Sequence, residues 1–119
     1  MILLNAKILL VKDELNDVVA IEAMIEESGY ETLPASAAEH KNSAQLPKNY
    51  PALIVCHYSK KENFSGVKMN GRHIPILLIS DADEKMVISA SSIQKIAYLT
   101  HPFSKIVLKT VIDMLLTSQ

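Results

Sequence analysis

The segment that most constrains how this chain can fold is Pro51–His57, in which the residues from Ala52 to Cys56 are apolar without a break. An uninterrupted apolar run of this length is typical of a parallel strand that helices cover on both faces. His57 ends the run. In open α/β sheets the carboxyl ends of the strands are where ligands and catalytic groups lie. The chemistry at this edge therefore decides what the protein can do.

Apolar runs elsewhere in the chain predict four further strands, separated by segments with helical patterns. The predicted strands are Lys7–Val11, Tyr30–Leu33, Ile74–Ile79 and Ala97–Thr100. Helices are expected between these strands and after the last one. The first follows Asn16 or Asp17, either of which can cap it, and Gly29 would end it. The others are expected over 37–45 and 82–91 and after Ser104, which can cap the last helix. Strands that alternate with single helices predict an α/β fold with a five-stranded, doubly wound parallel sheet between two helical layers.

The polar, basic segment Ser59–Arg72 is predicted to be a mobile loop with a short irregular helix. Its lysines could dock an acidic partner, but charge runs of this kind are more often solvated surface.

Length and composition describe one domain over residues 1–119. The formal charge of −1 gives no electrostatic case for binding nucleic acid or an anionic membrane. The single cysteine, Cys56, excludes an intrachain disulfide and favours a reducing, cytoplasmic location. It lies inside an apolar strand and is expected to be an unreactive core residue.

Four segments in order, KILLVKDE, PALIVCH, PILLIS and YLTHPF, resemble the receiver domain of two-component response regulators. The resemblance covers essentially the whole chain and implies the flavodoxin-like, CheY-like (βα)5 three-layer fold. It also implies a place in phosphorelay signal transduction. Receivers phosphorylate themselves on an aspartate, using an acidic pair for Mg²⁺, a hydroxyl beside the phosphoryl group and a lysine.

Three positions of this pocket depart from the receiver pattern. His57 stands at the nucleophile position, Lys12 replaces one carboxylate of the acidic pair, and His101 replaces the lysine. Only Asp13 and the hydroxyl of Ser80 are kept. Imidazole cannot form an acyl phosphate, and the ammonium of Lys12 would repel Mg²⁺. We therefore expect a pseudo-receiver that is not an enzyme and needs no cofactor.

Two residues of the receiver switch remain. Tyr98 occupies the position of the aromatic residue that changes rotamer in receivers, and His101-Pro102 resembles the cis Lys-Pro bond of the family. The alternative is that Tyr98 and Ser80 are ordinary packed residues at strand ends.

Other chemistry at the same edge stays open. Asp13, His57 and His101 could bind a transition metal or form a phosphate-responsive switch, and His57 could itself carry a phosphoryl group. A polar cluster without a ligand is the simpler interpretation.

We expect the domain to act by binding a protein partner or effector domain, or a second copy of itself, through its fourth and fifth α/β elements. Val107 and Met114 lie on the last helix outside its core stripe, which comprises Leu108, Val111, Ile112 and Leu115. Apolar surface beyond the needs of the core can mark an interface, although scattered apolar surface residues are common.

Overall fold

The structure is a computed structural model, and it describes residues 6–35, 51–64, 68–69, 72–81 and 95–117. The helices predicted over 37–45 and 82–91 lie outside the described residues. Within the described ranges, no helix is long and apolar enough to span a membrane.

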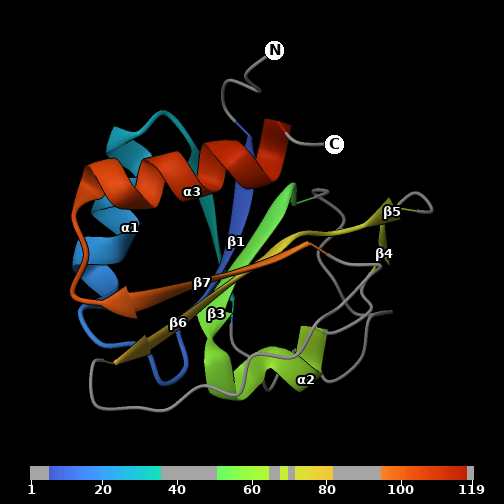
Figure 1. Ribbon diagram of the computed structural model, residues 1–119, viewed down its shortest axis with the longest axis horizontal. Helices are drawn as coiled ribbons and strands as arrows, with labels where there is room; N and C mark the ends of the chain where they lie inside the picture. Colours follow the sequence, from blue (N-terminus) through green and yellow to red (C-terminus); the bar gives the residue numbers. More distant parts are fainter. Residues whose placement is uncertain (1–5, 36–50, 65–67, 70–71, 82–94, 118–119) are drawn as a thin grey trace.

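A five-stranded parallel sheet forms the centre of the molecule, as predicted (Figure 1). Its strand order is β2-β1-β3-β6-β7, and the strands are β1 (Lys7–Val11), β2 (Glu31–Ala35), β3 (Leu53–His57), β6 (Ile76–Asp81) and β7 (Ile96–His101). The fourth predicted strand is displaced, because pairing continues past the apolar run. Ser80 pairs with Thr100 and Asp81 with His101.

Strand β3 is buried along its whole length, which explains its unbroken apolar sequence. It lies between β1 and β6, and its side chains alternate between the two faces of the sheet. Leu53 and Val55 contribute to one hydrophobic cluster, whereas Ile54 and Cys56 contribute to the other. Both faces are therefore covered, as the sequence predicted.

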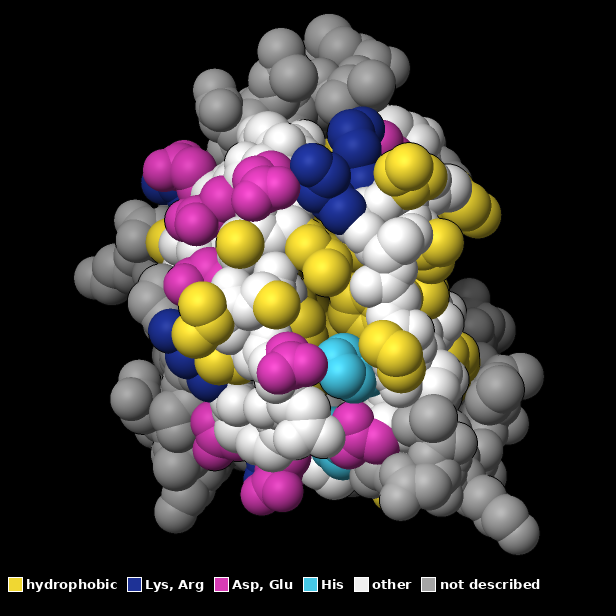
Figure 2. Space-filling view, turned by 90° about the vertical axis from the view of Figure 1, so that its left-hand side faces the viewer, with side chains coloured by type: hydrophobic (Ala, Val, Ile, Leu, Met, Phe, Trp, Pro, Cys, Tyr) yellow, Lys and Arg dark blue, Asp and Glu magenta, His cyan; other side chains and the backbone are white. Residues whose placement is uncertain are grey.

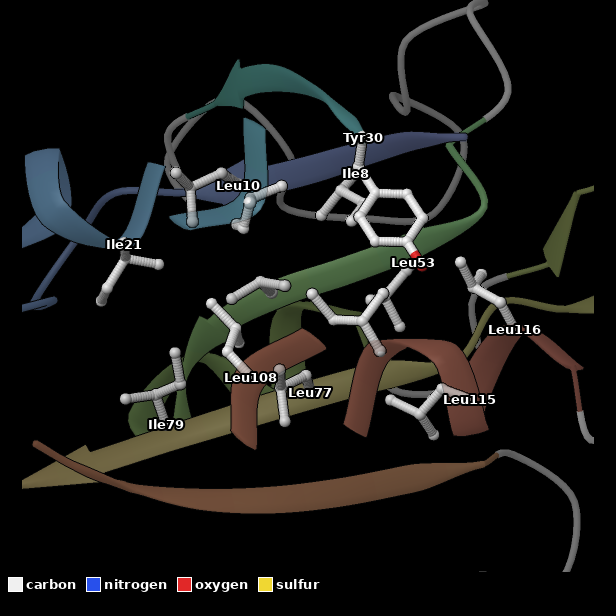
Figure 3. Packing of buried hydrophobic residues seen from close by; sticks show 13 residues of the cluster. Ile8, Leu10, Ile21, Tyr30, Leu53, Leu77, Ile79, Leu108, Leu115 and Leu116 are labelled. Atoms are coloured by element: carbon white, nitrogen blue, oxygen red, sulfur yellow. The ribbon is translucent and has the colours of Figure 1, made fainter. Parts of the chain in front are cut away.

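Helices α1 (Val18–Glu27) and α3 (Lys105–Thr117) cover one face of the sheet (Figure 3). The predicted stripe of α3 is correct at Leu108, Ile112 and Leu115, which are buried. Val111 is half-buried against the same cluster, and Leu116, which the predicted stripe omitted, is buried. The apolar face of α3 is thus wider than predicted.

In the segment that was predicted to be a mobile loop with a short irregular helix, the described residues include a short helix and also an antiparallel strand pair that was not predicted. They form a 3-10 turn at Tyr58–Lys60, the short helix α2 (Lys61–Phe64) and the antiparallel pair β4 (Lys68–Met69) and β5 (Arg72–His73). Phe64 is fully buried against the second face of the sheet and anchors α2 there. Asn-Gly, the dipeptide that two-residue hairpin connections favour, separates β4 from β5 in the sequence and was the missed signal.

The helix ends follow local chemistry, with one exception. Ser104 Oγ accepts the backbone N–H of Val107 at 3.2 Å and caps α3 as predicted. Gly29, with φ 97°, follows the end of α1, where glycine is favoured. The prediction that Asn16 or Asp17 caps α1 is wrong. Asp17 stands at the N-cap position, but its backbone is left-handed and its side chain makes no capping hydrogen bond.

Candidate functional site

The five predicted pocket residues all lie at the carboxyl edge of the sheet. Lys12 and Asp13 follow β1, His57 and His101 are the last residues of β3 and β7, and Ser80 is the next-to-last residue of β6. Because these strands are parallel, their carboxyl ends meet at one edge. The side chains nevertheless separate into distinct polar groups.

His57 is buried, with 6% of its surface exposed. Its Nδ1 accepts the backbone N–H of Ser59 at 3.2 Å and lies 2.8 Å from Ser59 Oγ. The ring also lies against that of Tyr58, with centroids 4.7 Å apart. A nitrogen that accepts a backbone N–H holds no proton itself, so the neutral ring carries its proton on Nε2. A phosphoryl carrier needs an exposed imidazole, and this buried, engaged ring does not favour that alternative.

His101 lies between two carboxylates. Its Nε2 is 3.1 Å from Asp17 Oδ2, and its Nδ1 is 3.9 Å from Asp81 Oδ1. Asn16 Nδ2 donates to the same Asp81 oxygen at 2.7 Å. We call these four residues, Asn16, Asp17, Asp81 and His101, the edge cluster. It joins the β1–α1 loop to the ends of β6 and β7.

Lys12 and Asp13 do not recreate an acidic pair. Lys12 Nζ lies 3.8 Å from Glu22 Oε2, so the ammonium is paired with helix α1. Asp13 is half-buried at the start of the β1–α1 loop. Among the described residues, no three His, Cys, Asp or Glu side chains are grouped so that they could hold a metal ion. The alternative metal site of Asp13, His57 and His101 is therefore not assembled.

Ser80 and Tyr98, the predicted switch residues, both lie in the sheet. Ser80 is 1% exposed, and its hydroxyl is 3.5 Å from that of Thr100 on the neighbouring strand. Tyr98 packs against the second hydrophobic cluster, and its buried hydroxyl has no hydrogen-bond partner within the described part of the chain. The His101-Pro102 bond is cis, as the resemblance implied. A switching role for Tyr98 and Ser80 stays a prediction.

Cys56 precedes His57 and faces the hydrophobic core on the opposite side of the strand. It is fully buried, and burial raises the pKa of its thiol to about 12. The prediction of an unreactive core cysteine is consistent with this environment.

The outer face of α3 is a second candidate surface. Val107 and Met114 are 44% and 62% exposed, and Ile106, which the sequence analysis did not single out, is 76% exposed. The hydroxyls of Thr110 and Thr117 on this helix donate to backbone carbonyls one turn earlier, at 2.8 and 2.6 Å. Figure 2 shows hydrophobic side chains bordering a hollow on one side of the molecule.

Sequence reasoning missed the partners in the edge cluster and the partner of His57. The position of Asp81 at the carboxyl edge could have been predicted, since it directly follows Ser80 at the end of an apolar run. Asn16 and Asp17 were interpreted only as helix caps, the commonest role of these residues before a helix. Ser59 gave no signal, because its contact with His57 depends on the turn that follows β3.

By sequence, the chain matches no described protein family and no curated protein. Solved structures of receiver domains are similar to it. The receiver domain of a sensor histidine kinase from Pseudomonas aeruginosa PAO1, with magnesium coordinated in its active site cleft, has a TM-score of 0.68 at 20% identity. That match covers 94% of this chain and 98% of the other.

Two further structures give the same result. The chemotaxis protein CheY4 of Vibrio cholerae has a TM-score of 0.67 at 19% identity and covers 92% of this chain and 98% of its own. A candidate response regulator from Chloroflexus aurantiacus has a TM-score of 0.66 at 24% identity, with 93% and 97% covered. The chain therefore has the CheY-like receiver fold that the sequence predicted.

Proposed function

We propose that this chain is a receiver-like domain of a two-component or phosphorelay system that has lost the phosphoryl switch and acts by binding protein. It is not an enzyme in this proposal and uses no cofactor. The observation that carries the proposal is His57. It occupies the end of the central strand where a receiver needs an aspartate, and its Nδ1 is already engaged by Ser59. Imidazole at this position offers no carboxylate for an acyl phosphate.

The charged groups at the carboxyl edge of the sheet support the same conclusion. Mg²⁺ is held in such sites by carboxylates and phosphate oxygens. Here Lys12 is paired with Glu22, and the carboxylates of Asp17 and Asp81 lie beside His101. The carboxylates of Asp17, Asp81 and Glu22 thus each have a partner within the chain.

The outer face of α3 supports a role in protein contact. Val107, Thr110, Met114 and Thr117 follow one another at spacings of three, four and three residues, the spacing of a seam between two helices. The two threonine hydroxyls are satisfied within α3, so burial would leave neither without a partner. We propose that a second copy of the chain packs on this uncharged seam, with an effector protein as the alternative.

Loss of the phosphoryl switch is tested by an amide NMR titration with Mg²⁺ plus beryllofluoride, a phosphoryl mimic. We expect no saturable shift at Asp13, His57, Ser80 or Tyr98, because the nucleophile and one metal-binding carboxylate are absent. A conventional receiver domain serves as the positive control. A saturable response centred on these residues would contradict the proposal.

Self-association is tested by sedimentation of the wild-type chain and of Met114→Lys. We expect a concentration-dependent dimer whose Kd rises at least about tenfold in the variant, since a lysine would be buried in the seam. Val19→Lys is the matched control, because Val19 on α1 is 76% exposed and lies outside the seam. It should leave the Kd unchanged. A wild-type chain that stays monomeric at high concentration would rule out the second copy as occupant.

A further inference from the structure

The edge cluster connects parts of the chain that are far apart in sequence. Asn16 and Asp81 are 65 positions apart, and Asp17 and His101 are 84 positions apart. Both contacts start from the β1–α1 loop and end on the last residues of neighbouring strands. The loop is therefore fastened to the sheet at two adjacent points.

The loop between β1 and α1 adopts a backbone conformation that its residues do not favour. Glu14 and Asp17 have φ values of 67° and 52°, although neither is glycine. Strained conformations of this kind persist where surrounding contacts hold them. Asp17 also leaves the N-terminus of α1 without a side-chain cap and turns its carboxylate to His101 instead. The contact with His101 thus replaces the local interaction that the sequence favours.

The strength of this fastening depends on the charge of His101. Histidine is the side chain that ordinarily gains or loses its proton between about pH 5 and 8. As imidazolium, His101 has a proton on each nitrogen and attracts the carboxylates of both Asp17 and Asp81. As neutral imidazole it keeps a single N–H, which can serve only one of them.

The other groups around His101 do not offset this dependence. Asp17 faces it from the loop, Asp81 faces it from β6, and the ring of Phe103 lies edge-on at 6.0 Å. Two lysines near the cluster in sequence are engaged elsewhere: Lys12, in the same loop as Asp17, pairs with Glu22, and Lys105, which follows His101 and starts α3, pairs with Glu27. Figure 2 shows a histidine between acidic side chains on the surface.

We propose that the edge cluster is a pH-sensitive fastening of the β1–α1 loop. The loop is held to His101 through Asp17 most firmly when His101 is charged, and this hold weakens when His101 is neutral, whereas the hydrogen bond from Asn16 to Asp81 stays. The weaker attraction at Asp17 lets the backbone of Glu14 and Asp17 relax and loosens the start of α1. This device is independent of the proposed function, because it concerns the order of the loop and not the occupant of α3.

The test is an NMR titration of the isotope-labelled full chain from about pH 5 to pH 8, the range over which histidine ordinarily titrates. We expect the amides of residues 14–18 and the side-chain amide of Asn16 to shift with the same midpoint as the His101 ring. At the upper pH, backbone order parameters in the loop should fall from about 0.85 toward 0.6.

Three variants make the test specific. His101→Gln keeps a neutral N–H donor but cannot titrate, and the loop response should disappear. Asp17→Asn should abolish the loop response while the His101 ring still titrates, and it provides a second result should His101→Gln fail to fold. His73→Gln removes a histidine on β5 and should leave the response intact. A loop response that persists in His101→Gln, or a titrating His101 ring with an unresponsive loop, would overturn the proposal.

Discussion

Replacing Phe64 with alanine is expected to lower the free energy of unfolding by about 3–5 kcal/mol, the usual cost of deleting a buried phenyl ring. Phe64 is fully buried against the second face of the sheet. Helix α2 spans only Lys61–Phe64 and is too short to persist without tertiary contacts. The ring therefore stabilises both the core beneath it and the segment that carries it.

Urea unfolding, followed by far-UV circular dichroism, measures this loss. Val19→Ala is the control, since Val19 is 76% exposed and its truncation should change stability by no more than about 0.5 kcal/mol. The slope of the free energy against urea should be similar in both variants if the native state stays compact. A loss below about 1 kcal/mol for Phe64→Ala would mean that the ring does not anchor α2 to the sheet.

The thiol of Cys56 is expected to react with a thiol reagent at least about a thousandfold more slowly in the native protein than in the unfolded chain. Burial raises the pKa of this thiol from 9.0 to about 12. Only the thiolate reacts, and each pKa unit lowers its population tenfold at neutral pH. The full burial of the side chain adds a steric barrier to the reagent.

Labelling with a chromogenic disulfide at increasing urea concentrations measures this protection. The rate should rise with the unfolded fraction, because the reagent reaches Cys56 only when the sheet opens. Val19→Cys supplies the matched control with a second, exposed thiol, which should react at once in the native state. Rapid stoichiometric labelling of the native wild-type chain would contradict the core role of Cys56.

Short-range patterns in the sequence were sufficient to predict the sheet and which of its faces are buried. The apolar run up to Cys56 predicted the central strand, and Ser104 predicted the start of α3. These features depend on residues close together in the chain, whose spacing fixes which face they bury. The pairing of the short strands β4 and β5 was not predicted, because the basic composition of the segment was given more weight than the Asn-Gly dipeptide between them.

The sequence by itself determined the fold class, the core and the list of groups at the carboxyl edge: Lys12, Asp13, His57, Ser80 and His101. Only the tertiary structure decided how those groups are used. It paired Lys12 with Glu22, turned Asp17 from a helix cap into a partner of His101, and seated Phe64 in the core. The periodic spacing of apolar residues along the chain predicts which of them are buried. The partner of a polar side chain depends instead on which residues folding brings within hydrogen-bonding distance, and these can be far apart in the sequence.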